Sequence, residues 1–158
     1  MPRPPAPRPE LILDAVNLLH TWGRLTTARD TALGPALDSL VHRCLPLIDA
    51  RGWQLWLAID QRDATRPRTE APHPHVTYAY APSAQTADGL IEARLLAPPH
   101  PIAAIVSGDG ALTRATLAAG RDAWTPAMLA DACRAAQQST RLRASRQTHG
   151  DLSQGLFG

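Results

Sequence analysis

The sequence predicts an α/β fold built on a mostly parallel sheet. Short, nearly continuous apolar runs alternate with segments whose apolar residues recur at helical spacing. Apolar runs of this kind are typical of parallel strands that are covered on both faces. The order strand, helix, strand, strand, helix, strand, helix is that of an α/β layer fold, and 158 residues are enough for one domain.

Four segments have the composition of buried strands. The first is residues 10–14, which end in the "LILD" of "LILDAVNLLH", and the second, 53–60, again closes on an aspartate. The third, 75–81, is rich in β-branched and aromatic residues, and the fourth begins the stretch 101–110. The polar, proline-bearing residues 61–74 predict a loop between the second and third strands.

Helical spacing predicts helices within 30–50, 82–97, 109–120 and 123–138. Pro46 is expected to kink or break the first of them, and Gly52 to end it. Gly120 is expected just past the end of the third helix. Thr125 is expected to cap the fourth, with Pro126 at its first position.

These elements divide the chain into a proline-rich arm (1–9), one domain (10–139) and a basic, flexible tail (140–158). Residues 1–10 do not resemble a secretory signal, and no apolar run is long enough to span a membrane. Cys44 and Cys133 lack metal-type spacing and are expected as buried free thiols. The sequence therefore predicts a cytoplasmic protein.

The positive charge comes from arginine alone, since the chain has no lysine. Arginine binds phosphate well, but the net charge of +2 does not by itself indicate a nucleic-acid-binding protein. The glycine motifs of dinucleotide-binding folds and phosphate loops are missing, as is the serine-hydrolase elbow. These absences disfavour a nucleotide- or phosphoprotein-binding domain and a serine hydrolase.

Acidic residues follow the predicted strands. Asp14 and Asp60 end the first two strands, Asp88 opens the helix after the third, and Asp109 follows the fourth. Because parallel strands end at one edge, these four carboxylates are expected to meet there, with Glu92 one helical turn beyond Asp88. Each also has a purely structural interpretation. An aspartate after a strand is often the N-cap of the next helix, as Asp109 can be, Asp88 suits the positive end of its helix, and Glu92 suits a solvated helix face.

Gathered carboxylates repel one another and are costly to ionise together. A hard divalent cation such as Mg²⁺ or Mn²⁺ relieves that repulsion, and such sites perform phosphoryl chemistry. The acidic edge therefore predicts a metal site.

The order of these segments resembles the YacP-like group of the NYN family, within the PIN-like nucleases. The matching segments are "LILDAVNLLH", "WLAID", "QTADGLIEARL", "AIVSGDGALTRATLAAG" and "WTPAML". The resemblance covers residues 10 to about 136. The chain departs from it at Ala15 and Val16, where the family has glycine and tyrosine.

The resemblance implies a PIN-like three-layer sandwich and a metal-dependent endoribonuclease. It implies that Asp14, Asp88 and Asp109 hold Mg²⁺ or Mn²⁺, and that Asn17 orients Asp14 or a metal-bound water. A turn-forming role is the alternative for Asn17. Glu92 and Asp60 match acidic positions that complete or support the site.

The implied partner is RNA, free or presented on the ribosome. Phosphate contacts are expected from Arg114 and from Arg62, Arg66 and Arg68 in the predicted loop. A catalytically silent RNA- or ribosome-binding module on the same fold is the alternative function. The acids argue against that alternative, because a non-enzymatic RNA-binding protein gains no affinity from a negatively charged pocket.

Overall fold

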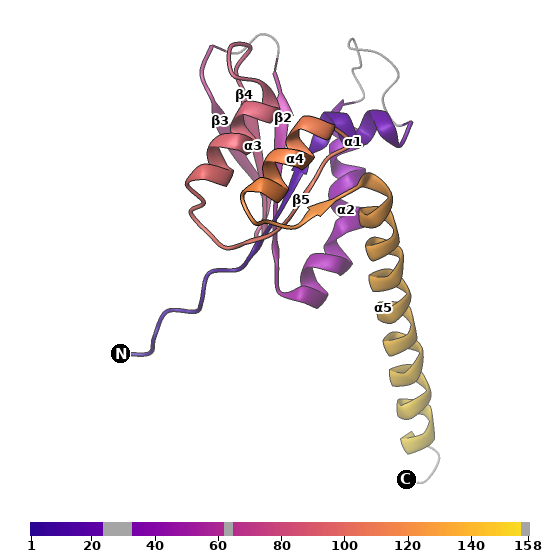
Figure 1. The fold of residues 1–158 in the computed structure, drawn as a ribbon. Helices are drawn as coiled ribbons and strands as arrows, with labels where there is room; N and C mark the ends of the chain where they lie inside the picture. Colours follow the sequence, from indigo (N-terminus) through magenta and orange to yellow (C-terminus); the bar gives the residue numbers. More distant parts are fainter. Residues whose placement is uncertain (24–32, 62–64, 156–158) are drawn as a thin grey trace.

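The computed structural model describes residues 1–23, 33–61 and 65–155, with side chains to residue 150. It contains a mixed α/β domain from which one long helix extends (Figure 1). The elements in chain order are β1 (Glu10–Asp14), α1 (Ala15–Thr21), α2 (Leu33–Arg51), β2 (Gln54–Asp60), β3 (Arg68–His73), β4 (Val76–Ala81), α3 (Thr86–Leu96), β5 (Ile102–Val106), α4 (Gly110–Ala118), β6 (Ala123–Trp124) and α5 (Pro126–Gly155).

The described strands form one sheet in the order β3-β4-β2-β1-β5-β6. All neighbours pair in parallel except β3, which runs antiparallel to β4. The predicted, mostly parallel sheet is therefore confirmed. β1 lies at its centre between β2 and β5, so its residues have strand neighbours on both sides.

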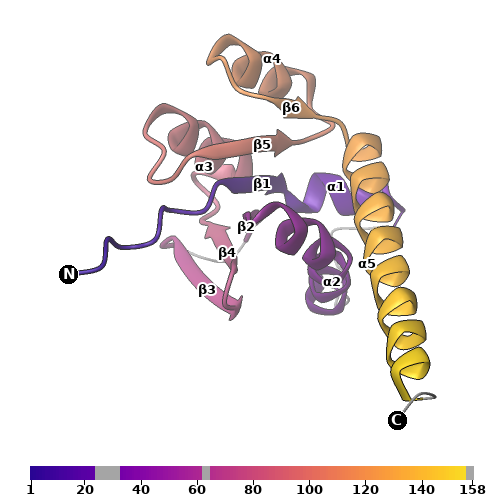
Figure 2. The ribbon, with the colours of Figure 1, turned by 90° about the horizontal axis from the view of Figure 1, so that it is seen from below.

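Helices cover both faces of the sheet, as in a PIN-like three-layer sandwich (Figure 2). Successive side chains of a strand point to opposite faces. Leu11 and Leu13 accordingly pack into the core beneath α1, α2 and α5, whereas Ile12 packs into the core beneath α3 and α4. β1 is buried along its whole length, which explains its continuous apolar composition.

Several predicted helix ends are confirmed. Gly52 and Gly120 follow α2 and α4 with φ of 65° and 73°, a left-handed conformation that glycine adopts without strain. The Thr125 hydroxyl accepts a hydrogen bond from the Met128 amide at 3.1 Å and so caps α5. Pro46 lies inside α2 without ending it.

One local prediction was wrong, and two helical segments were not predicted. Residues 61–74 are not a loop throughout, because Arg68–His73 forms the exposed edge strand β3. The helix α1, which was not predicted from the sequence, begins directly after Asp14. Residues 140–155, expected to belong to a tail, continue α5, which runs to Gly155.

Cys44 and Cys133 are buried free thiols, as predicted, and their sulfur atoms lie 3.9 Å apart between α2 and α5. None of the described helices combines the length and the apolar composition needed to cross a membrane.

A buried ion pair fixes the start of β1 against the end of α3. Both carboxylate oxygens of Glu10 accept hydrogen bonds from Arg94, at 2.8 and 2.7 Å. The Glu10 side chain is 4% exposed, and the Arg94 guanidinium lies 4.3 Å from the centroid of the Trp56 ring. This pair ties the amino end of the central strand to the helix that carries Asp88.

We expect Glu10→Gln to lower the free energy of unfolding by about 3 kcal/mol, because it leaves Arg94 without its carboxylate. Urea unfolding followed by circular dichroism measures the loss. The matched control is Asp131→Asn, which breaks the exposed pair with Arg134 and should change stability little. Equal effects of the two substitutions would contradict the structural role of the buried pair.

Candidate active site

The candidate site lies at the carboxyl ends of the neighbouring strands β1 and β5. Along the chain, the sheet grows from β1 to β2 and β4 on one side and then returns to β5 on the other. Strand order thus reverses beside β1, and ligands of open α/β sheets bind outside the carboxyl ends of the strands at such a point. Asp14 ends β1 there, and Ser107 directly follows β5.

Asp14 is the most perturbed carboxyl group at this edge. It is 4% exposed, and its Oδ2 accepts a hydrogen bond from the Ser107 hydroxyl at 3.2 Å. Burial, followed by the charge of Asp88 and a hydrogen bond with it, raises the pKa of Asp14 from its ordinary 3.8 to about 7. Ser107 lowers the pKa, and Asp60 adds a smaller increase. Asp14 and Asp88 are therefore a contacting carboxyl pair.

The other two aspartates serve as helix caps. The Oδ1 atom of Asp60 accepts a hydrogen bond from the amide of Ala87, in the first turn of α3, at 2.6 Å. Asp109 is the N-cap of α4, and its Oδ1 accepts from Leu112 at 2.9 Å. Asp14 also precedes a helix but makes no side-chain capping bond with it. Capping thus accounts for Asp60 and Asp109 but not for Asp14.

Two side-chain bonds join the loop after β5 to the start of α1. The Asn17 Oδ1 atom accepts a hydrogen bond from the Gly108 amide at 2.9 Å. Ser107 Oγ accepts one from the Asp109 amide at 3.0 Å while it donates to Asp14. Gly108 fits closely, since a Cβ there would lie 3.1 Å from Asn17 Oδ1. Asn17 therefore holds this loop rather than forming a turn after β1.

Asp88 lies in the first turn of α3, beside a strained residue. Thr86 has a φ of 59°, which is unusual for a β-branched residue. Its hydroxyl accepts from the Gly89 amide at 3.2 Å, and Asp60 holds the neighbouring amide. The local bonds thus maintain a conformation that costs free energy, as is common near functional sites. Glu92 is exposed one turn beyond Asp88.

The described side chains include no group of three His, Cys, Asp or Glu close enough to form a ready metal site. The donor chemistry at the Asp14–Asp88 pair nevertheless fits a hard divalent cation. Two carboxylates touch there, and Asp60 lies near enough to act on Asp14 electrostatically. Carboxylate oxygens are the ligands that Mg²⁺ and Mn²⁺ prefer. Asp109 is connected to the pair through Ser107.

The predicted phosphate-binding arginines are spread around the domain. Arg66 and Arg114 are exposed. Arg68 lies in β3 and not in a loop. It forms an ion pair with Glu70, and its guanidinium lies 4.1 Å from the centroid of the Tyr80 ring. Arg62 lies outside the described residues. Arg68 is thus engaged locally, whereas Arg66 and Arg114 are open to solvent.

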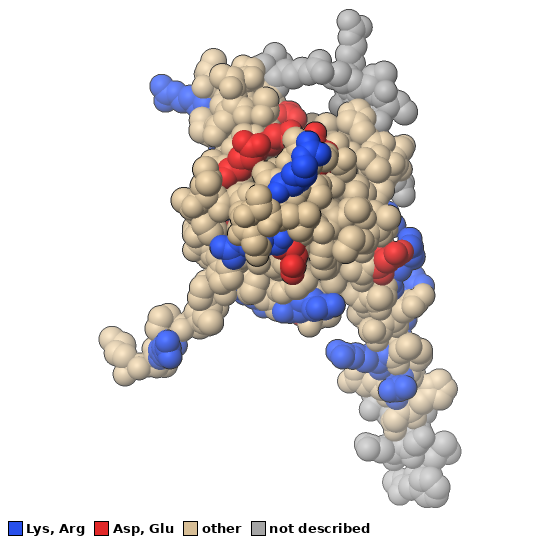
Figure 3. Space-filling view, in the orientation of Figure 1, with Lys and Arg blue, Asp and Glu red and all other residues tan. Residues whose placement is uncertain are grey.

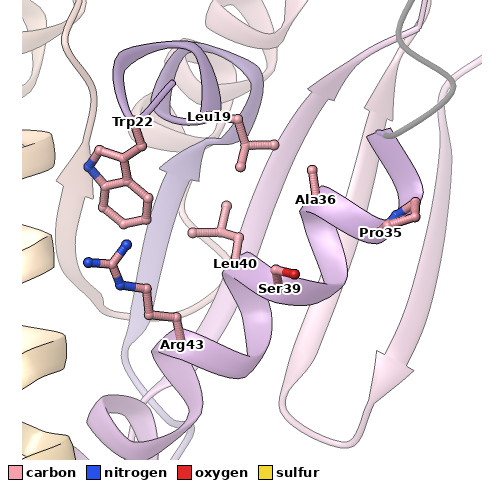
Figure 4. Close-up of a pocket in the computed structure, with 7 residues that line it drawn as sticks. All are labelled: Leu19, Trp22, Pro35, Ala36, Ser39, Leu40 and Arg43. Carbon is pink, nitrogen blue, oxygen red and sulfur yellow. The ribbon is translucent and has the colours of Figure 1, made fainter. Parts of the chain in front are cut away.

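A small apolar pocket lies where α1 and α2 meet (Figure 4). Its volume is about 220 Å³, and the Arg43 guanidinium covers the Trp22 ring at 4.4 Å from the centroid. Trp22 also packs against the core below α1 and α2. The remaining lining residues are Leu19, Pro35, Ala36, Ser39 and Leu40.

Ser107 is the site residue that sequence reasoning missed. A serine at a strand end has many ordinary roles, and its bond to Asp14 joins residues 93 positions apart. The available signal was its place between an apolar strand and Asp109 in "AIVSGDG". Only the pairing of β1 with β5 shows that it faces Asp14.

A mostly parallel sheet with a carboxyl pair at its switch point defines an α/β protein of nuclease-like fold. The YacP-like NYN domain profile matches residues 11–155, and the chain belongs to that family. The family predicted from the sequence is thus confirmed. No curated protein sequence matches the chain.

Solved structures show the same fold. Rae1 (YacP) from Bacillus subtilis superposes with a TM-score of 0.70 at 16% identity, covering 92% of this chain and 85% of that one. Its W164L mutant gives 0.71 at 17% identity, covering 89% and 84%. At this identity the likeness shows the fold alone.

Because the pKa of Asp14 is raised, the Asp14→Asn variant should become more stable relative to wild type as pH rises, when both are measured in a chelator that removes metal ions. Below about pH 3 both folded and unfolded chains keep the proton, so the carboxyl costs nothing. Between about pH 4 and 7 mainly the unfolded chain releases it, so wild-type stability falls as pH rises. The stability of Asp14→Asn relative to wild type should increase by about 2.5 kcal/mol between pH 5 and 8.

Urea unfolding at several pH values in EDTA measures this difference. Asp49→Asn, at an exposed position of α2, is the matched control and should show no such trend. A stability difference that stays constant with pH would show that Asp14 titrates normally in the folded chain.

Ser107→Ala should raise the pKa of Asp14 further, by about one unit, because the hydroxyl hydrogen bond stabilises the carboxylate. A titration of the Asp side-chain carbonyl carbons by NMR, without metal, measures the change. Ser107→Thr retains the hydroxyl and should preserve the wild-type value. An unchanged pKa in Ser107→Ala would remove Ser107 from the electrostatics of the pair.

Proposed function

We propose that this chain is a metal-dependent endoribonuclease that hydrolyses RNA phosphodiester bonds at the carboxyl edge of the sheet. The observation that supports it best is the contact of buried Asp14 with half-buried Asp88. Two ionised carboxylates in contact repel each other, and a divalent cation makes the arrangement favourable. The family and its nuclease-like fold support hydrolysis of a nucleic acid.

Asp14 and Asp88 would hold Mg²⁺ or Mn²⁺, with Asp109 as the third proposed ligand. Asp109 has a second carboxylate oxygen beyond the one that caps α4. Asp60 and Glu92 would support the site from its rim. When bound, such an ion polarises the phosphate and lowers the pKa of a coordinated water.

The protein's own contribution is positioning. Ser107 donates to one oxygen of Asp14, which fixes the orientation of that carboxyl group. Asn17 holds the Gly108 amide and so keeps the loop carrying Asp109 against α1. Exposed Arg66 and Arg114 are the proposed phosphate contacts on the domain. RNA as the substrate follows from the family resemblance.

Wild-type protein should cleave RNA with Mg²⁺ or Mn²⁺ and lose this activity in EDTA. Asp14→Asn and Asp88→Asn should each reduce the cleavage rate by about 100-fold or more, since each removes a proposed ligand. Gel analysis of an end-labelled RNA, with matched DNA alongside, measures rate and substrate preference. Asp49→Asn is the control and should cleave like wild type.

Cleavage that persists in both Asp14→Asn and Asp88→Asn would show that the reaction occurs elsewhere. Failure of wild-type protein to cleave any RNA, free or on ribosomes, would favour the silent binding module. In that case a binding measurement with the same RNAs distinguishes an RNA-binding protein from one that does not bind RNA.

A further inference from the structure

The second half of α5 is a basic helix that leaves the domain. We name residues 137–150 the basic extension. Every residue in it is exposed, whereas Leu129 and Cys133 in the first half are buried in the core. At 1.5 Å per residue the extension is about 20 Å long. Figures 1 and 2 show it projecting beyond the layers of the domain, and in Figure 1 it runs away from α1.

Its charge has one sign. Arg141, Arg143 and Arg146 lie in the extension, and the sequence has no Asp or Glu between Ala132 and Gly150. None of the three arginines forms an ion pair with a described side chain, in contrast to Arg134, which pairs with Asp131. Figure 3 shows blue side chains along this helix and the red ones gathered mainly at the opposite end.

The extension has no apolar face. Leu142, which is 61% exposed, is its one large aliphatic residue. A helix that docks in a protein groove needs apolar anchors at i, i+3, i+4 and i+7, and a helix that lies on a membrane needs an apolar side. Neither partner is matched by this sequence, whereas binding of phosphates through arginine needs no apolar contact.

The arginines are distributed around the helix. At 100° per residue, Arg143 and Arg146 lie within 60° of each other, and Arg141 lies more than 120° from both. The hydroxyls of Thr140 and Thr148 bond to carbonyls of their own helix, at 3.0 Å each. The charged hydrogen-bond donors of the extension are thus its three arginines, and they can bind phosphates on two sides of the helix.

The extension also needs a partner to be stable as a helix. It makes no packing contacts that bury its side chains, and an isolated helix of this length is marginal in water. Arg143 and Arg146 repel each other at i, i+3. A polyanion that neutralises them stabilises the helix.

We propose that the basic extension binds the phosphate backbone of RNA, at a surface separate from the acidic edge. This inference rests on the proposed function, since it adds a second contact for the same substrate. α5 has 30 residues and is about 45 Å long, so RNA that touches both surfaces must be long or folded. The extension therefore contributes to binding of long RNA and not to cleavage of a short one.

The test measures binding of fluorescein-labelled oligouridine by anisotropy in EDTA, over a range of salt concentrations. The probes are an RNA of about 60 nucleotides and one of about 8, the size of a single binding groove. The main variant is Arg141→Gln/Arg143→Gln/Arg146→Gln. Its matched control, Gln137→Ala/Gln138→Ala/Gln147→Ala, changes the same helix without changing charge, and the triple Arg→Lys variant keeps the charge.

We expect the Arg→Gln variant to bind the long RNA at least about tenfold more weakly at low salt. The slope of log K against log salt should fall by about 2, since each phosphate contact to single-stranded RNA contributes about 0.7. The Arg→Lys variant and the alanine control should bind like wild type. Helicity measured by circular dichroism should rise on adding RNA to wild type and not to the Arg→Gln variant.

Unchanged binding of the long RNA by the Arg→Gln variant overturns the inference, as does an equal loss in the alanine control. Preference of the extension for anionic phosphatidylglycerol vesicles over RNA also overturns it. Cleavage of the short RNA with Mn²⁺ separates the two proposals. If wild type cleaves nothing but long-RNA binding depends on the arginines, the proposed function fails and the extension's role stands.

Discussion

The contact between Asp14 and Asp88 is the constraint around which the edge of this fold is arranged. β1 is the central strand, so the residue at its carboxyl end is enclosed by neighbours on both sides and cannot turn its side chain fully into water. The first turn of α3 brings a second carboxyl group to the same place. Repulsion between a buried carboxyl group and a neighbouring carboxylate is relieved by a proton, by hydrogen-bond donors or by a cation. The chain supplies one donor, the Ser107 hydroxyl, which lowers the pKa of Asp14. Burial and Asp88 raise that pKa by more, so the donor does not offset them.

The four aspartates at this edge divide into two kinds. Asp60 and Asp109 accept hydrogen bonds from backbone amides at the starts of α3 and α4, where the partial positive charge of a helix N-terminus stabilises a carboxylate. Those two need no cation. Asp14 precedes a helix but does not cap it, and its carboxyl group turns to Ser107 and Asp88 instead. A metal-dependent site is therefore favoured by the contact between Asp14 and Asp88, and not by the number of acidic residues at the edge.

The sequence predicted the fold and the edge better than it predicted the elements at the periphery. Buried strands leave continuous apolar runs, and Gly52, Gly120 and Thr125 mark helix ends through local geometry, so these were recognised. β3 was missed because it is exposed and polar, with no apolar alternation. The end of α5 was missed because an unpacked helix has no reason to show apolar spacing. The structure also explains Ala15 and Val16: α1 begins at Ala15 in helical conformation, so no glycine is needed, and both side chains contact the core.

Acidic and basic side chains gather on different parts of this molecule, which its net charge of +2 does not show. An acidic edge repels a polyanion until a cation occupies it. Screening at physiological salt limits electrostatic action to about 8 Å, so arginines spread along an exposed segment about 20 Å long offset little of that repulsion through space. Under the two proposals, attraction at the basic extension and chemistry at the acidic edge act on different segments of one RNA. Such a division would let affinity come from phosphates that are not cleaved, and would leave the carboxyl pair free to meet the scissile bond with few other contacts.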